Sequence, residues 1–219
     1  MHGIHGLAEH SHSKVRRLPL SQGIGGKQGA REVRLFFAVN VTPEIRERLA
    51  QVQRPLVATG ADVKWVEVPN LHVTMKFLGE VPEDKVPAII AQADQVAKEA
   101  KAFVLSLGGL GAFPTQRAPR VVWAGLTDGV EELKALARGL EDRLEKLGFK
   151  PEGRPFSAHV TLGRVRSPKG RDALAQALES ARGCEIGTMN VEKFDLMQSI
   201  LDRGGPQYSV VQEFRLGAE

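Results

Sequence analysis

The spacing of apolar residues predicts that ordered structure begins near Val33 with a strand and then a helix. Residues 35–39 form an uninterrupted apolar run, which is the pattern of a strand buried on both faces. Thr42 and Pro43 follow as a helix N-cap and a first-turn proline, and apolar residues then recur at helical spacing to about residue 53. The first two elements are therefore a strand and a helix.

The middle of the chain continues this alternation. Residues 64–68 and 71–78 alternate polar and apolar side chains, which predicts two strands, and a second helix begins after Pro82. Residues 108–119 are rich in glycine and proline, so we expect an irregular loop near a functional site. Strands are predicted on both sides of this loop, at 103–107 and 120–125.

The second half of the chain repeats the order of strands and helices. A helix is predicted from an Asp128 N-cap, with Glu131 three residues later as its capping-box partner, to Gly148. The remaining elements are a strand at 158–165, a helix from Ser167 and Pro168 to Arg182, and strands at 190–198 and 208–214. This alternation predicts an α+β or α/β domain with helices packed outside a sheet.

Two segments within the predicted strands are similar to each other. Residues 71–75 read Leu-His-Val-Thr-Met, and residues 158–162 read Ala-His-Val-Thr-Leu. Each segment has predicted helices nearby, as a duplicated lobe would have. The two copies would then face one another across a cleft.

Each of these strands presents one imidazole and one hydroxyl to a single surface. Residues two apart in a strand point to the same face, so His72 projects with Thr74, and His159 projects with Thr161. With an ordinary pKa near ~6.5, one histidine can hold a proton at neutral pH while the other lacks one. Concerted acid and base catalysis requires such a pair, and the threonine hydroxyls would donate to developing negative charge.

A structural role for these histidines is the alternative. An isolated histidine in a strand is more often a hydrogen-bonded structural residue, but the predicted folded part of this chain contains no histidines except His72 and His159. Both also stand in the same tripeptide at the same position of a strand. We therefore interpret His72, His159, Thr74 and Thr161 as catalytic residues.

Composition restricts the class of protein and of site. The chain has 219 residues, of which 42% are hydrophobic and 26% charged, so it has room for one domain or two small lobes. The single cysteine, Cys184, excludes an internal disulfide framework and favours a cytoplasmic location. We find no apolar run of the ~20 residues that a membrane helix needs, and no Asp, Glu and His cluster with metal-ligand spacing. We expect no membrane association, no metal and no cofactor.

The chain is divided into two parts by its amino-terminal composition. Residues 1–32 contain several glycines and four histidines but no apolar stretch of a secretory signal, so we expect a flexible extension. Residues 33–219 are expected to form a single bilobal domain and a monomer. The net charge of +4 suits a polyanionic ligand but is too small to identify one.

The two hydrophobic-His-x-Thr-hydrophobic segments resemble the signature of the 2H phosphoesterase superfamily. The resemblance is greatest to its bacterial and archaeal RNA 2′,3′-cyclic phosphodiesterase branch, also called 2′-5′ RNA ligases. It extends from about Val33 to Phe214, and includes residues 34–39, 77–82, 111–114 and 119–123. It implies a two-lobed, pseudo-symmetric α+β fold, with antiparallel sheets facing a central cleft and helices outside. It also implies metal-independent hydrolysis of RNA 2′,3′-cyclic phosphate ends to 2′-phosphomonoesters.

The resemblance implies residue roles as well. By analogy, His72 donates a proton to the leaving O3′ and His159 accepts one from water. An arginine five residues after the second histidine, here Arg164, stacks on a base in the family. Strict alternation would put Arg164 on the face of Val160, away from the site, whereas a bulge at Gly163 would return it to the cleft. The alternative for Arg164 is a solvated arginine at a sheet edge.

Further substrate contacts are expected around the middle segment. Arg120 and Arg117 flank it and are candidate phosphate contacts, although basic loop residues are more often only solvated. Phe113 is a candidate for stacking on a base, and holding the loop in place is its alternative role. Trp123 is expected in the core.

Four other functions are left open by the sequence. The same fold would serve a 2′-5′ RNA ligase acting on tRNA halves, or a phosphodiesterase for another cyclic nucleotide. A non-catalytic module would bind RNA ends in the cleft without turnover. A metal-binding protein would use the amino-terminal histidines His2, His5, His10 and His12.

Overall fold

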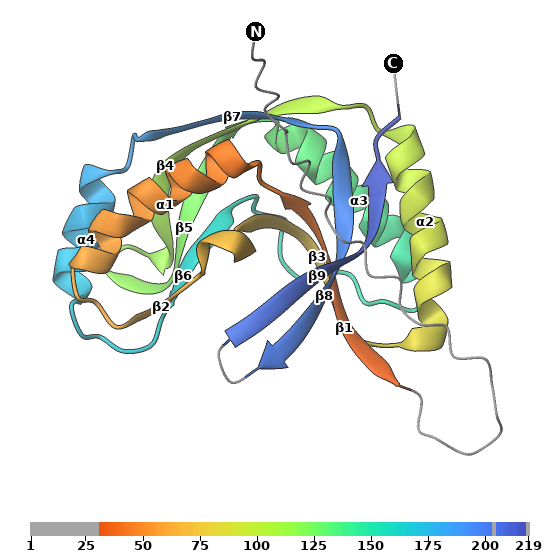
Figure 1. Cartoon of the computed structure of the whole chain (residues 1–219), viewed down its shortest axis with the longest axis horizontal. Helices are drawn as coiled ribbons and strands as arrows, with labels where there is room; N and C mark the ends of the chain where they lie inside the picture. The colour runs from red at the N-terminus through yellow and green to blue at the C-terminus, as the bar shows by residue number, and fades with distance from the viewer. Residues whose placement is uncertain (1–30, 203–204, 218–219) are drawn as a thin grey trace, which may run out of the picture.

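The protein, seen in a computed structural model that describes residues 31–202 and 205–217, is built on one curled antiparallel sheet (Figure 1). Within that part of the chain the strand order is β7-β4-β5-β6-β3-β1-β8-β9, and β2 lies beside β6. The strands are β1 Glu32–Asn40, β2 Val63–Trp65, β3 His72–Pro82, β4 Phe103–Thr115, β5 Ala118–Asp128, β6 Val160–Val165, β7 Glu185–Val191, β8 Lys193–Asp202 and β9 Gly205–Arg215.

Among the described residues, four α-helices cover the outside of the sheet in two pairs. They are α1 Pro43–Ala58, α2 Val86–Glu99, α3 Val130–Glu145 and α4 Arg171–Ser180, and the short 3-10 helices η1 Val68–Asn70 and η2 Glu83–Lys85 precede β3 and α2. Helices α2 and α3 pack against β3, β8 and β9, whereas α1 and α4 pack against β7 and β4. The predicted two-lobed α+β fold with helices outside is confirmed.

The two lobes meet at the β3–β6 pair. We call β3, β1, β8 and β9 with α2 and α3 the first lobe, and β6, β5, β4, β7 and β2 with α1 and α4 the second lobe. Each lobe therefore contributes one of the two strands that carry a His-Val-Thr segment, at the centre of the strand order. Because every strand pair is antiparallel and the sheet is continuous, its inner face is a single concave surface shared by both lobes.

Alternation along β1 shows how the sheet separates its two faces. Leu35, Phe37 and Val39 are buried in the main core beneath the helices. Phe36 and Ala38 point the other way and form a smaller apolar cluster with Met197 on the concave face. The uninterrupted apolar run of the sequence thus supplies two different surfaces, because both faces of this central strand are covered.

The long strands β4 and β5 correct the prediction of an irregular loop at 108–119. Only Gln116 and Arg117 separate the two strands, and the rest of that segment belongs to the hairpin. The pairing is interrupted by shifts of register, one of them between Leu107 and Leu110, where Gly109 has a φ of 72°. Bulges of this kind admit glycine and proline into a strand without ending it.

Two further features of the fold differ from the sequence prediction. Helix α3 has Gly129 as its N-cap, in the left-handed conformation, and Asp128 instead accepts a hydrogen bond from the Gly129 backbone N–H at 2.9 Å. Strand β7 is absent from the predicted elements. Residues 1–30 of the predicted extension lie outside the described residues, and Glu32 already belongs to β1.

Among the described helices, none combines the length and the apolar character that a membrane crossing requires.

A buried ion pair fastens β3 to α3. The Lys76 side chain is 1% exposed, and its Nζ donates to Glu141 Oε1 at 2.7 Å and to the Lys150 carbonyl oxygen at 3.3 Å. Thr74 points to the concave face, and regular alternation would send Lys76 to the same face. Lys76 instead faces the helices, because a bulge at Met75 shifts the register. A lysine at this depth requires its carboxylate, since an unpaired buried ammonium is very costly.

We therefore expect Glu141→Ala to lower the free energy of unfolding by about 2–4 kcal/mol, because it leaves the Lys76 ammonium buried without a charged partner. Urea denaturation measures this loss. Adding Lys76→Met to the same variant should recover most of it. Glu131→Ala, which breaks the exposed pair with Lys134, is the control and should cost less than about 0.5 kcal/mol. An equal effect of the two glutamate substitutions would contradict this account.

Candidate active site

The pairing of Val73 with Val160 brings the two His-Val-Thr segments together. These valines are register partners on β3 and β6, and both are fully buried in the core. Their neighbours in sequence therefore point to the opposite, concave face, and all four are partly exposed there: His72, Thr74, His159 and Thr161. His159 stands directly before β6, which begins at Val160 and so is shorter than predicted.

The two imidazoles are held in the same way. His72 Nδ1 lies 2.7 Å from the carbonyl oxygen of Asn70, and His159 Nδ1 lies 2.7 Å from the carbonyl oxygen of Ser157. A carbonyl oxygen only accepts hydrogen bonds, so Nδ1 carries the proton and donates in both rings. In each neutral imidazole Nε2 is therefore the unprotonated nitrogen, the one free to exchange a proton with a substrate.

The Nε2 atoms differ in their surroundings. His72 Nε2 lies 3.0 Å from Thr74 Oγ1, which donates its hydroxyl proton when the ring is neutral. For His159 Nε2, no hydrogen bond occurs among the described residues. The site thus contains one Nε2 that already has a hydroxyl partner and one that is open to a small molecule.

Burial on the concave face lowers the pKa of both imidazoles below their ordinary value. In each case burial is the largest cause, since it disfavours the charged ring, and the hydrogen bond to a backbone carbonyl acts in the opposite direction. The positive charge of His159 further lowers the pKa of His72, and that of Arg164 further lowers the pKa of His159. The free site therefore favours two neutral histidines at pH 7.

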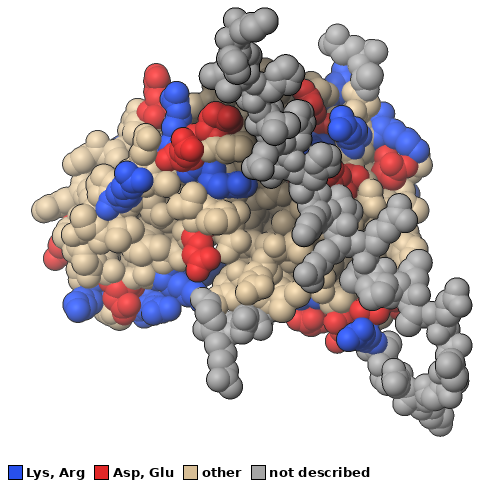
Figure 2. Space-filling view, in the orientation of Figure 1, with Lys and Arg blue, Asp and Glu red and all other residues tan. Residues whose placement is uncertain are grey.

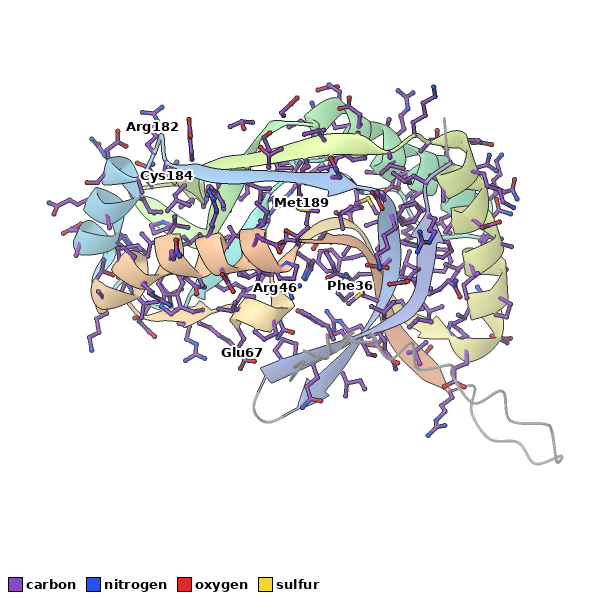
Figure 3. All side chains as sticks on the ribbon, turned by 45° about the horizontal axis from the view of Figure 1, so that its top comes forward. Phe36, Arg46, Glu67, Arg182, Cys184 and Met189 are labelled. Atoms are coloured by element: carbon purple, nitrogen blue, oxygen red, sulfur yellow. The ribbon has the colours of Figure 1, made fainter. Side chains whose placement is uncertain are left out.

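Aromatic rings surround both histidines. The Phe36 and Tyr208 ring centroids lie 5.1 Å and 5.4 Å from that of His72, and Phe113 lies 5.2 Å from His159 with its ring nearly perpendicular. Figure 3 labels Phe36 on β1 near the middle of the molecule, close to the hairpin of β8 and β9 that carries Tyr208. These rings contribute to the burial of the imidazoles, and burial is the largest cause of their lowered pKa values.

Sequence reasoning missed Phe36 and Tyr208 as site residues. Phe36 lies within an apolar run that gives no sign of which side chains leave the core. Tyr208 is the chain's one tyrosine, and no motif surrounds it. The β8–β9 hairpin that carries Tyr208 is also tied to the first histidine segment, because Asn70 Nδ2 donates to the Pro206 carbonyl oxygen at 3.2 Å.

Arg164 lies on the same face as the histidines. Between Thr161 and Gly163 the pairing of β6 with β5 shifts by one residue, so Leu162 and Gly163 are both buried and alternation restarts at the exposed Arg164. The expected bulge therefore exists next to Gly163. The Arg164 charge acts on His159 and also on Tyr208, whose pKa is raised by burial and lowered by this arginine. The Arg164 guanidinium is therefore close enough to His159 to act on the charge of its ring, and its contact with a substrate stays a prediction.

The other predicted contacts are distributed around this centre. Phe113 contacts His159, on strand β4 rather than on a loop. Arg120 is exposed at a bulge of β5, and among the described contacts none joins its side chain to either histidine, so its role stays a prediction. Arg117 is exposed in the turn between β4 and β5.

Trp123 corrects the expectation of a core residue. Val122 and Ala124 on either side of it are buried, so Trp123 points to the concave face, where it is the register partner of Thr161. Its indole lies against Gly111, where a Cβ atom would come within 2.3 Å of the ring. Trp123 also lines a pocket of about 490 Å³ that reaches Arg182, and neither histidine lines it. In Figure 3, Arg182 and Phe36 are well separated.

Charges of both signs are interspersed on the face shown in Figure 2. Within residues 31–202 and 205–217, no group of three or more His, Cys, Asp or Glu side chains is arranged to hold a metal ion. The amino-terminal histidines lie outside the described residues.

Comparisons with known proteins agree with this geometry. The family model described as LigT-like phosphoesterase matches residues 39–123 and 126–208. A protein of Methanothermobacter thermautotrophicus named RNA 2′,3′-cyclic phosphodiesterase is 37% identical over 185 residues, which are 84% of this chain and 100% of the relative. A protein of the same name from Aeropyrum pernix is 38% identical over 77% of this chain and 94% of its own length.

Solved structures give the same result. A Thermus thermophilus protein superposes with a TM-score of 0.73 at 33% identity, covering 85% of this chain and 99% of that one. Escherichia coli LigT complexed with 3′-AMP superposes with a TM-score of 0.68 at 28% identity, covering 85% of this chain and 99% of LigT. LigT has also been crystallised with phosphate.

Replacing Arg164 tests the electrostatics of the site. We expect Arg164→Gln to raise the pKa of His159, because removing a nearby positive charge favours the protonated ring. The pKa of His72 should change less. Titration of the imidazole signals by NMR measures both. Arg166→Gln, which removes an exposed charge two residues further on, is the control, and an equal shift of the His159 pKa in both variants would contradict the placement of Arg164.

Proposed function

This chain belongs to the LigT-like phosphoesterase family, and on that basis we propose that it hydrolyses RNA 2′,3′-cyclic phosphate ends to 2′-phosphomonoesters, with His72 and His159 as acid and base. The single observation that carries the proposal is the matched pair of imidazoles on one concave face. Both rings are held through Nδ1 by a backbone carbonyl, which leaves Nε2 for proton transfer.

The proton transfers balance over one hydrolysis. His159 Nε2 takes a proton from water as the water oxygen bonds to phosphorus. The bond from phosphorus to O3′ breaks, and protonated His72 gives its Nε2 proton to O3′, which leaves as the 3′-hydroxyl. One ring has then gained a proton and the other has lost one, and exchange with solvent restores the starting state.

The substrate itself supplies the charge that this cycle needs. Burial lowers the pKa of both imidazoles, which favours their neutral forms in the free site at pH 7. A bound cyclic phosphate places a negative charge beside the rings, which favours the protonated form and raises the pKa of the proton donor. The catalytic protonation state therefore forms together with the substrate complex.

Hydroxyl and guanidinium groups complete the proposed site. Thr74 and Thr161 share the concave face with the histidines and would donate to the non-bridging oxygens, where charge develops. The hydroxyl of Thr74 rotates to the phosphate when His72 Nε2 carries a proton. Arg164 would contact the terminal nucleotide beside His159. No step of this scheme uses a metal ion.

The assignment of direction rests on two arguments. By family analogy the first histidine donates and the second accepts. The open Nε2 of His159 supports the same direction, because a general base needs a free lone pair for the attacking water. The names of the archaeal relatives and the 3′-AMP complex of LigT support a nucleotide substrate. A cytoplasmic location and a monomeric state also stay proposals, the first resting on the single cysteine.

Replacement of the catalytic histidines tests the reaction. We expect His72→Ala and His159→Ala each to lower kcat by about 10²- to 10⁴-fold on a short RNA ending in 2′,3′-cyclic phosphate, the contribution of one general acid or base. Thr74→Ala and Thr161→Ala should lower kcat by about 10- to 100-fold, through loss of a hydrogen bond made to the transition state. The assay contains EDTA, and the 2′-phosphate product is measured by chromatography.

Thr127→Ala, an exposed threonine on β5, is the matched control and should keep wild-type kcat. If the wild-type protein bound this RNA without turnover, the result would instead support a non-catalytic RNA-end-binding module. A product joined by a 2′-5′ bond, with no hydrolysis, would instead support the ligase.

The lowered histidine pKa values predict the pH dependence. As pH rises through the pKa of His72 the acid is lost, and as pH falls through the pKa of His159 the base is lost. Because both values lie below 6.5 in the free protein, we expect kcat/KM to have its optimum below pH 6.5. The optimum of kcat should lie at higher pH, since bound phosphate raises the donor's pKa. Coincident optima would rule out the proposed effect of the substrate.

A further inference from the structure

Phe77 is an exposed aromatic residue on the face that carries the site. Its side chain is 54% exposed, and it is the one aromatic residue among the exposed large hydrophobic residues of the described chain. A single exposed apolar residue needs no explanation by itself. Phe77 differs from an ordinary exposed apolar residue in its orientation and in its neighbours.

A bulge turns Phe77 toward the concave face. On β3, Thr74 pairs with Ala38 and Lys76 pairs with Phe37, so Met75 is an extra residue that shifts the alternation. Phe77 then becomes the register partner of Phe36. Without this bulge Phe77 would point to the core, with Val73 and Met75.

An aromatic surface joins Phe77 to the site. The Phe36 ring centroid lies 5.9 Å from that of Phe77 and 5.1 Å from that of His72. Phe36 itself is buried, so Phe77 is the part of this surface that a ligand can cover. Only the Phe36 ring lies between Phe77 and His72, the proposed proton donor. We call Phe36 and Phe77 the aromatic platform.

A positive charge lies next to this platform. Arg34 precedes Phe36 by two residues on β1 and therefore shares the concave face. Its side chain is 49% exposed, and the one carboxylate that it contacts within the described part of the chain, Glu80 on β3, is loose at 3.8 Å. An exposed pair at this distance leaves the guanidinium available to another anion.

We propose that Phe77 and Arg34 form a second nucleotide subsite, in which the base next to the cyclic-phosphate nucleotide stacks on Phe77 and a phosphate of the strand contacts Arg34. Stacking on aromatic residues beside basic side chains is how proteins hold single-stranded RNA without reading its sequence. The inference rests on the proposed function and narrows its substrate to an oligonucleotide. Glu80 weakens the subsite, because its carboxylate competes with the phosphate for Arg34.

The test compares a uridine 2′,3′-cyclic phosphate mononucleotide with an RNA pentamer ending in the same group. We expect Phe77→Ala to raise KM for the pentamer about tenfold more than for the mononucleotide, the loss of one stacked base. Phe77→Trp should keep the low KM, because the larger ring still stacks. Val104→Ala, which trims an exposed residue on β4, is the control and should change neither KM.

Charge substitutions test independently whether Arg34 contacts a phosphate of the strand. Arg34→Gln should raise KM for the pentamer and reduce the slope of log affinity against log salt by about 0.7, the value for one contact to a single strand. Glu80→Gln should lower KM for the pentamer, since it frees Arg34. Equal changes for the mononucleotide would overturn the subsite.

Binding separates failure of this subsite from failure of the proposed function. Fluorescence anisotropy with a pentamer ending in a 2′-phosphate reports stacking even if no turnover occurs. Wild type without turnover, but with pentamer binding that Phe77→Ala weakens, would refute the hydrolase and keep the subsite. Unchanged binding in Phe77→Ala would refute the subsite. A change of oligomeric state on light scattering, with unchanged RNA binding, would assign Phe77 to contact with a second copy of this chain.

Discussion

The contact between Val73 and Val160 determines the site, because the strands of the two lobes meet there. Among the described residues, β3 and β6 are in register only at this pair. Both valines are fully buried, so the packing of the core fixes the contact, and the helices of each lobe support it from outside. Strand alternation then directs the flanking histidines and threonines to the concave face. The spacing of the imidazoles is therefore a property of the core, although the imidazoles themselves lie outside it.

The same packing explains why the free site favours the neutral form of both histidines. The aromatic rings of Phe36, Tyr208 and Phe113 lie against the imidazoles, and the positive charge of Arg164 opposes protonation of His159. An anion changes this balance more in such surroundings than it would in bulk water. Selectivity for an anionic ligand thus comes from apolar residues as much as from the arginine.

Much of the architecture could be read from the sequence where periodicity was strong. The buried strand at 35–39, the helical stripe of α3 and the repeated His-Val-Thr segments all follow from local spacing. The sequence predicts strands at 103–107 and 120–125 but not their extension through 108–119 into one long hairpin, because bulges admit glycine and proline at positions that normally end a strand. Trp123 was misassigned for a related reason: which face of β5 is concave depends on pairing with Thr161, a residue far away in sequence. Phe36 and Tyr208 became site residues only through the curvature of the sheet.

The way in which the rings are anchored has an evolutionary consequence. Asn70 and Ser157 orient the histidines through main-chain carbonyls, which every amino acid possesses. The Ser157 side chain can therefore change while the tautomer of His159 persists, provided that the local path of the chain survives, whereas the Asn70 side chain also donates a hydrogen bond to the Pro206 carbonyl oxygen. Related proteins could then differ in sequence beside the second histidine and still hold both imidazoles in the same tautomer. A search for a long sequence signature would not find such proteins.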